Sequence, residues 1–216
     1  MRRAGSAVLS VVVATLLALL CAPHAVAQGP WFDHAVGSAN QVIAVRGSGA
    51  GTTVEAWQRS PLGWHRISPA IPAEVGAAGF AAEAADGVPA TPEGVFTLDA
   101  AFGTQPSPGG GLPYRVVGPD DWWDGDRQSP TYNTHQVCPP GSCGFDESQS
   151  EQLAIPAYRY AVVMGVNAER RPGGGGAFFL HVANGQPTEG CVAVDEAPLV
   201  WLIRWLRPGA VIAITG

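Results

Sequence analysis

Lysine is absent from this sequence, and charge of either sign is scarce. All 12 basic residues are arginine, charged residues make up 14% of the chain, and the net charge is −6. An acidic surface repels the phosphates of nucleic acids and the headgroups of anionic membranes. We therefore expect neither a nucleic acid nor an anionic membrane surface as a partner.

No apolar run is long enough to span a bilayer, which takes about 20 residues. Residues 7–22 form an apolar run that follows Arg2 and Arg3 and precedes the small-residue sequence at 25–27. This order is typical of a secretory signal peptide. We expect residues 1–27 to be removed on export to the cell envelope or medium, without stable membrane insertion. Losing two arginines changes the net charge from −6 to −8.

Cysteines are also few. Cys21 lies in the expected signal peptide, and Leu20 before it is larger than the small residue that usually precedes a lipid-modified cysteine. The remaining number is odd, so an oxidising compartment leaves one thiol free or intermolecular. Cys138 and Cys143 flank a Pro-Pro-Gly-Ser turn, which makes a local disulfide the natural pairing and leaves Cys191 over.

Short strands dominate the rest of the chain. We divide it into a lead-in, residues 28–39, and one domain, residues 40–216, with neither repeats nor a long linker. Turn signals rich in glycine and proline separate runs of β-branched and aromatic residues, a pattern that predicts a mainly β sandwich or barrel. The clearest expected strands are residues 42–45, 53–58, 94–99, 115–117, 159–166, 177–182 and 211–215.

One helix is expected after Cys191, starting at Asp195. Asp195 is a suitable N-cap, and Pro198 lies in the first turn, where a missing N–H is tolerated. Pro208-Gly209 ends the helix. Its sequence is apolar almost all round, which indicates a helix wedged between other elements, with a main face of Leu199, Leu202, Ile203 and Leu206. A thiol near a helix N-terminus has its thiolate favoured.

His181 and Cys191 are candidates for a base and a thiol nucleophile. His181 ends an expected strand, and residues 183–187 form a compact loop before the chain returns to Cys191. Across such a loop the imidazole can accept the thiol proton, so that the thiolate attacks a carbonyl. Gly190 lets a substrate approach the backbone, and the N–H groups of Gly190 and Cys191 are candidates for holding an oxyanion.

Two other interpretations of these residues stay open. One is a buried cysteine beside a satisfied core histidine, with no chemistry. The other is a zinc site of His181, Glu189 and Cys191, although the sequence lacks the Cys-x-x-Cys or His-x-x-x-His spacing that would support it. We predict no metal and no cofactor.

Around these residues the sequence resembles the YkuD-type L,D-transpeptidases. Residues 188–192, Thr-Glu-Gly-Cys-Val, with His181 upstream, are similar to the family signature of a histidine, a spacer and then Ser/Thr-His-Gly-Cys. Residues 91–96, Thr-Pro-Glu-Gly-Val-Phe, match a Thr-Pro-x-Gly-x-Phe motif common at the start of a strand in these enzymes. The resemblance implies a YkuD-like β-sandwich or barrel of mixed sheets, with the helix following the cysteine.

The resemblance extends over about residues 40–216. Asn133, directly after Tyr132, and the run of residues 158–167 resemble an exported actinobacterial branch of the family. If the nearby Cys138–Cys143 loop caps the active site, Tyr132 and Asn133 are candidates for lining the substrate groove.

The resemblance also implies an enzyme that acts on peptidoglycan stem peptides, and we expect a monomer. Cys191 would attack the bond between an L-centre and a D-centre, with His181 as its base. The D-residue would leave, and the thioester would pass to an amine of a neighbouring stem. Family histidines are oriented by the backbone carbonyl just after them, here Val182, and Thr188 and Gly190 match supporting positions.

The chain departs from the family pattern beside the cysteine. Glu189 replaces the histidine before Gly-Cys, Ala193 replaces an Arg or Asn, and the spacer from His181 to Cys191 is shorter. A Glu189 carboxylate facing the thiol would raise the pKa of Cys191. Facing outward, it would instead be placed to bind the cationic end of an acceptor.

Two alternative functions use the same fold. An L,D-carboxypeptidase or endopeptidase would release the same thioester with water. A catalytically inactive wall-binding protein would keep the fold alone, and Glu189 is the residue that raises this alternative. Transpeptidation and hydrolysis differ in acceptor access and water exclusion rather than in the nucleophile.

Overall fold

The computed structural model describes residues 29–48 and 51–216, and the expected signal peptide, residues 1–27, lies outside this part of the chain. The fold is mainly β with one α-helix among the described residues, as the sequence predicts. Ten strands form the main sheet: β1 (Gln41–Ser48), β2 (Gly51–Ser60), β3 (Gly63–Arg66), β4 (Ile71–Ala73), β7 (Gly94–Gly103), β8 (Tyr114–Val116), β12 (Ala161–Met164), β13 (Phe179–Val182), β14 (Val192–Val194) and β15 (Val211–Thr215).

The remaining elements are short. One small sheet contains β9 (Asp121–Trp123), β10 (His135–Val137) and β11 (Glu151–Gln152), and another contains β5 (Phe80–Ala81) and β6 (Thr91–Pro92). The helices are the 3-10 turns η1 (Glu147–Gln149) and η2 (Pro156–Arg159) and the α-helix α1 (Glu196–Trp205).

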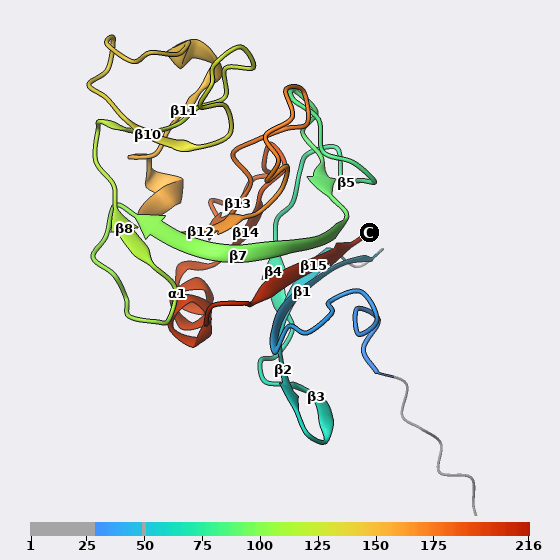
Figure 1. The fold of residues 1–216 in the computed structure, drawn as a ribbon. Helices are drawn as coiled ribbons and strands as arrows, with labels where there is room; N and C mark the ends of the chain where they lie inside the picture. Colours follow the sequence, from blue (N-terminus) through green and yellow to red (C-terminus); the bar gives the residue numbers. More distant parts are fainter. Residues whose placement is uncertain (1–28, 49–50) are drawn as a thin grey trace, which may run out of the picture.

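The main sheet is mixed and curls toward closure. Its order is β14-β13-β12-β7-β15-β1-β2-β3, with β4 beside β2 and β8 beside β7. The pairs β1–β15, β13–β14 and β7–β8 are parallel, and the others are antiparallel. Backbone hydrogen bonds of 2.8 and 2.9 Å between Glu74, just after β4, and Ala193 of β14 link the two ends of the curl. Figure 1 shows the long β7 lying across this sheet beside β12 and β15.

The apolar core fills the inside of the curl. On β1, Ile43 and Val45 point into this core, and Val42 and Ala44 point outward, as alternation along a strand requires. The helix α1 packs on the same core with its expected apolar residues, Leu199, Leu202, Ile203 and Leu206.

The lead-in covers the outward face of β1 and β2. The Phe32 side chain is fully buried, and its ring meets those of Trp57 and Trp64 edge-on at 5.7 and 5.2 Å. The Trp64 indole N–H donates to Asp33 at 2.6 Å. Residues 29–39 therefore pack as part of the domain and do not form a separate arm.

Two details of α1 differ from the sequence prediction. Asp195 is the N-cap residue, but its side chain makes no capping hydrogen bond. Trp201 is 40% exposed and stacks on Trp205 at 6.1 Å, so the helix is not wedged between elements on every side. Some of the apolar side chains of α1, including Trp201, therefore face outward.

Each of the seven expected strands overlaps an observed one; residues 211–215 match β15 at both ends, and the other six have shifted ends. The expected strand at 177–182 begins only at Phe179, because Ala177 has a φ of +56°, outside the extended region. Arg159 belongs to η2 and not to the strand that follows. The expectation missed β14, a fully buried Val-Ala-Val segment of three residues.

A long excursion between β8 and β12 contains β9–β11, η1 and η2, and lies at the upper left of Figure 1. The expected Cys138–Cys143 disulfide lies here, and the Glu147 carboxylate accepts the backbone N–H groups of Gly141 and Cys143 beside it. The excursion packs on the outer face of β12 and β13 through an apolar cluster that includes Leu153, Tyr158, Phe179 and Cys191. Within the described residues, no helix is both long and apolar enough to cross a membrane.

Candidate active site

Cys191 lies just before β14, between the main sheet and the excursion. It is 8% exposed and is the free cysteine in the described part of the chain. Its sulfur accepts the Phe179 backbone N–H at 3.3 Å and donates to the Ala177 carbonyl at 3.4 Å. The resting thiol is thus held by the backbone where β13 begins.

The environment of Cys191 favours the thiol and not the thiolate. Burial raises its pKa to about 12, and the carboxylate of Glu151 adds to this increase. The expected influence of a helix N-terminus stays a prediction: the extended strand β14 and Asp195 lie between Cys191 and the start of α1. Activation therefore needs a proton acceptor at the site.

His181 has the orientation that the family resemblance implies. It lies on β13, with its ring nitrogen Nδ1 at 3.0 Å from the carbonyl oxygen of Val182. A carbonyl can only accept, so Nδ1 carries the proton and Nε2 is left as an acceptor. Burial lowers the pKa of His181, which keeps the ring neutral. Among the described residues, no hydrogen bond joins this ring to Cys191, whose thiol faces Ala177.

Thr188 and Gly190 hold the backbone around the cysteine. The Thr188 hydroxyl donates to the Cys191 carbonyl at 2.7 Å and accepts the Gly190 N–H at 3.1 Å. The Gly190 N–H is therefore engaged and is not a free oxyanion donor as the sequence suggested. Gly190 itself is required by its φ of +136°, and a Cβ here would lie 2.7 Å from the Phe178 ring.

Thr91, from the Thr-Pro motif, reaches the same carbonyl from a distant part of the chain. Its side chain is fully buried, donates to the Cys191 carbonyl at 3.3 Å and accepts the Gly76 N–H at 2.9 Å. The sequence marked Thr91 only as part of a family motif. The structure places it against the backbone of the nucleophile candidate.

A hollow of about 270 Å³ opens beside Cys191 and His181. Glu189 lies on its rim with an exposed side chain, so it does not face the thiol as one interpretation expected. The charge that opposes the thiolate comes from Glu151. Ala193 stands where the family pattern has a polar residue. It is fully buried and pairs with Glu74 in an isolated antiparallel β-bridge.

Glu151 and Tyr158 belong to this site and were missed in the sequence. Both line the hollow, and the Tyr158 hydroxyl donates to the Glu151 carboxylate. The Tyr158 ring meets the His181 ring edge-on at 5.4 Å. Tyr158 stood in the run that resembles the family branch, but no local pattern linked either residue to Cys191.

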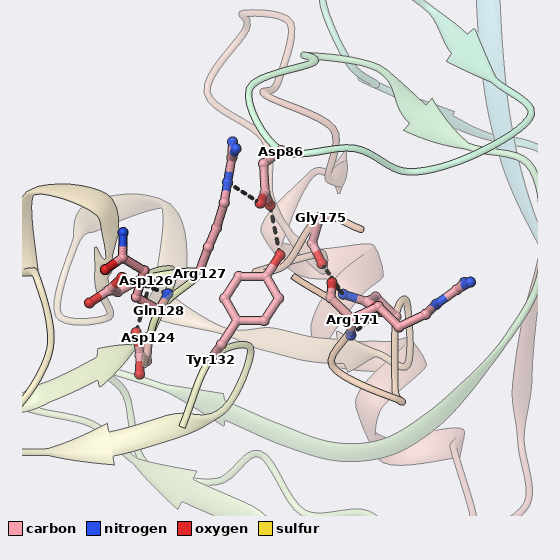
Figure 2. A network of polar contacts seen from close by, with 9 residues as sticks. Asp86, Asp124, Asp126, Arg127, Gln128, Tyr132, Arg171 and Gly175 are labelled. Carbon is pink, nitrogen blue, oxygen red and sulfur yellow. Dashed lines mark hydrogen bonds and ion pairs between the residues drawn. The ribbon is translucent and has the colours of Figure 1, made fainter. Parts of the chain in front are cut away.

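A second hollow adjoins the first and contains Tyr132. It shares Glu151 and Ala177 with the hollow beside Cys191. Figure 2 shows Asp86 between Tyr132 and Arg127: the Tyr132 hydroxyl donates to Asp86 at 2.8 Å, and Arg127 pairs with Asp86 at 2.6 Å. Burial, followed by the bond to Asp86, raises the pKa of Tyr132.

Asn133 supports the backbone at the edge of both hollows. Its side-chain oxygen accepts the Trp123 indole N–H at 2.8 Å and the Ala177 N–H at 3.3 Å, and its NH2 donates to the carbonyls of Val166 and Asn167. The amide is fully engaged, so its role in this structure is to position Ala177, whose carbonyl holds the Cys191 thiol.

A zinc site is not indicated by the geometry. Across residues 29–48 and 51–216, no group of three or more His, Cys, Asp or Glu side chains is arranged to hold a metal ion. The alternative using His181, Glu189 and Cys191 therefore has no set of ligands in the described structure.

The structure is thus a mainly β protein with a curled mixed sheet, in which His181 lies on β13 and Cys191 directly precedes the parallel neighbouring strand β14. The chain matches the model of the YkuD family, the L,D-transpeptidase catalytic domain, over residues 71–214. It therefore belongs to this family of L,D-transpeptidase-type enzymes. Searches of curated proteins and of solved structures gave no match.

Proposed function

We propose that this chain is an exported L,D-transpeptidase that joins peptidoglycan stem peptides through a Cys191 thioester. One observation carries the proposal: in this YkuD domain, a free buried thiol and a neutral His181 line the same hollow. The Nδ1–H group of His181 donates to the Val182 carbonyl. His181 then presents the unprotonated Nε2 that a base requires.

In the proposed reaction the thiol turns from the Ala177 carbonyl and gives its proton to Nε2 of His181. The sulfur attacks the carbonyl carbon of the bond between the L-centre and the D-centre, and the D-residue leaves as an amine that takes back the proton. An amine from a second stem then attacks the thioester, restores the thiol and forms the cross-link. Glu189, exposed on the rim, is placed to attract a cationic acceptor.

The direct test incubates the protein with stem tetrapeptides and measures products by mass spectrometry. We expect peptide dimers with wild type and none with Cys191→Ala or His181→Asn. Tripeptide with free D-residue and no dimer would instead identify hydrolysis by the same thiol. Absence of both products with folded wild-type protein would overturn the proposal in favour of a wall-binding protein.

Export is the second part of the proposal. It is supported by the signal-like residues 1–27 and by the Cys138–Cys143 disulfide, which is compatible with an oxidising compartment. The test expresses the full chain in a bacterium and sequences the N-terminus of the protein outside the cytoplasm. An N-terminus at Gln28 is expected, and intact Met1 in the cytoplasm alone would contradict export.

A further inference from the structure

The hollow that contains Tyr132 has no role in the reaction proposed above, although it adjoins the hollow of Cys191. It has a volume of about 350 Å³, within the range of pockets that hold small ligands. It shares Glu151, Gly176 and Ala177 with the hollow beside Cys191, and the Ala177 carbonyl holds the resting thiol. A peptide that reacts at Cys191 can therefore extend past Ala177 into this second hollow.

Most side-chain donors of the second hollow are already used within the fold. Those that donate to neighbouring residues belong to Trp123, Tyr132, Ser148, Gln149 and Ser150. Arg127 differs from them, because its ion pair with Asp86 uses only Nε. Among the described residues, the two terminal nitrogens of Arg127 have no partner. The hollow therefore offers a guanidinium to a ligand.

Asp86 and Tyr132 fix the position of this guanidinium. One oxygen of Asp86 accepts the Tyr132 hydroxyl at 2.8 Å, and the other lies 2.6 Å from Nε of Arg127. Figure 2 shows the Asp86 carboxylate between the two side chains, with the terminal nitrogens of Arg127 extending beyond this contact. A guanidinium held at Nε presents its outer N–H groups as a fork that matches the two oxygens of a carboxylate.

The other charges that line the second hollow allow a carboxylate to bind there. Asp86 is compensated by Arg127 and by the bond from Tyr132. Glu151 lies on the boundary with the Cys191 hollow, where its carboxylate accepts the Tyr158 hydroxyl. Burial raises the pKa of Glu151, which favours its uncharged form. A ligand that is an acceptor and carries a negative charge fits the free donors of Arg127 best.

We propose that Arg127 binds a carboxylate of the peptide that reacts at Cys191, and that Asp86 and Tyr132 are positioning residues for its guanidinium. The inference rests on the proposed function in that the ligand is a stem peptide. The carboxylate has two possible sources, the C-terminus of the stem and an acidic side chain along it. Both present the same pair of oxygens, so Arg127 determines specificity in either case.

The experiment measures the binding of a stem tetrapeptide by isothermal titration calorimetry, in a Cys191→Ala background that prevents turnover. Adding Arg127→Gln should raise Kd about tenfold. This lies at the lower end of the effect of losing a hydrogen bond to a charged group, because the Arg127 side chain is 54% exposed. Arg127→Lys keeps the charge but loses the fork, and it should recover only part of the affinity.

Arg171→Gln is the matched control, because it removes the same charge from a neighbouring loop. Arg171 lines a different hollow, and Figure 2 shows its guanidinium pointing away from Tyr132. We expect its Kd to differ from that of the background protein by less than about twofold, the effect of a screened surface charge. An equal loss of affinity in Arg171→Gln and Arg127→Gln would reduce the effect to general charge and overturn the proposal.

Amidated peptides identify which carboxylate is bound. One peptide has an amide at its C-terminus, and another has amides on its acidic side chains. Amidation of the bound group should raise Kd about tenfold when Arg127 is present and by less than about twofold in Arg127→Gln, because the partner is then already missing. Amidation of the other group should have the same effect with and without Arg127.

The proposal is overturned if Arg127→Gln leaves Kd unchanged, if no amidation effect depends on Arg127, or if no form of the protein binds the peptide. Circular dichroism confirms folding, and if Arg127→Gln does not fold, the same comparison is made with Arg127→Lys. Binding needs no turnover, so this proposal and the proposed function fail separately. Peptide dimers from wild type together with binding that ignores Arg127 would refute the carboxylate site alone. Binding that depends on Arg127, without any peptide product, would refute transpeptidation alone.

Discussion

The hydroxyl of Thr91 donates to the carbonyl of Cys191 at 3.3 Å, although the two residues stand 100 positions apart in the chain. Thr91 belongs to β6 and also accepts the backbone N–H of Gly76. Thr91 thereby links β6, the segment at Gly76 and the segment at Cys191, directly before β14. The Thr-Pro motif is consequently part of the framework of the site.

Replacing Thr91 by valine keeps the shape and removes the hydroxyl. The buried Gly76 N–H then loses its acceptor, and we expect a loss of about 1–3 kcal/mol in the free energy of unfolding. Urea denaturation followed by tryptophan fluorescence measures this. Thr91→Ser, which keeps the hydroxyl, is the matched control and should retain most of the stability. A loss in Thr91→Ser with none in Thr91→Val would show that the methyl group matters and the hydrogen bonds do not.

Gly190→Ala should damage the site through backbone strain and a steric clash. The residue has a φ of +136°, and a Cβ would lie 2.7 Å from the Phe178 ring and 3.0 Å from the Ala90 carbonyl. We expect a destabilisation of at least about 1–3 kcal/mol, together with loss of peptide products. Gly185→Ala is the control, because its φ is also positive, at +80°, but nothing lies near the added Cβ. Similar effects at both positions would contradict the importance of the clash.

Glu189→Gln should leave thiol reactivity unchanged. The side chain is exposed on the rim, and solvent screens its charge, so the rate at which iodoacetamide alkylates Cys191 should change by less than about twofold. Glu151→Gln is the comparison, and it should increase the alkylation rate, because the Glu151 carboxylate helps to raise the pKa of Cys191. A marked increase with Glu189→Gln would mean that this carboxylate faces the thiol in solution.

Stability should fall at alkaline pH because of Cys191. The pKa of the folded thiol is raised from 9.0 to about 12, so the folded protein retains a proton that the unfolded chain loses. The resulting stabilisation is complete below about pH 9 and is lost as pH rises towards about 12, by about 1.4 kcal/mol per pH unit. The unfolding free energy of wild type relative to Cys191→Ser should therefore decrease over this range. A constant difference would contradict the raised pKa.

The sequence predicts the features of this protein that depend on neighbouring residues. The β class follows from short alternating runs, and the core face of α1 follows from the spacing of its leucines. The Cys138–Cys143 pairing follows from a turn between two cysteines. The family follows from residues 188–192 with His181, and the matching family model confirms it.

Features that depend on tertiary contacts could not be read in this way. Glu151 and Tyr158 come to Cys191 only because the excursion folds back over β13, and no spacing in the chain encodes that contact. The strand β14, which lies between Cys191 and α1, was also missed, because three residues are too few to give a periodic signal. Glu189 drew attention by its place next to Gly190, but side-chain direction depends on the backbone of the loop.

The bridge between Glu74 and Ala193 has a consequence for how a peptide can reach the thiol. β14 pairs with β13 on one side, and on the other side the N–H and carbonyl of Ala193 are both bonded to Glu74. A bound peptide cannot add itself as a further strand there, because the backbone groups it would need are already taken. The proposed stem-peptide substrate would therefore be recognised by the side chains that line the hollow beside Cys191, and not by extension of the sheet at β14.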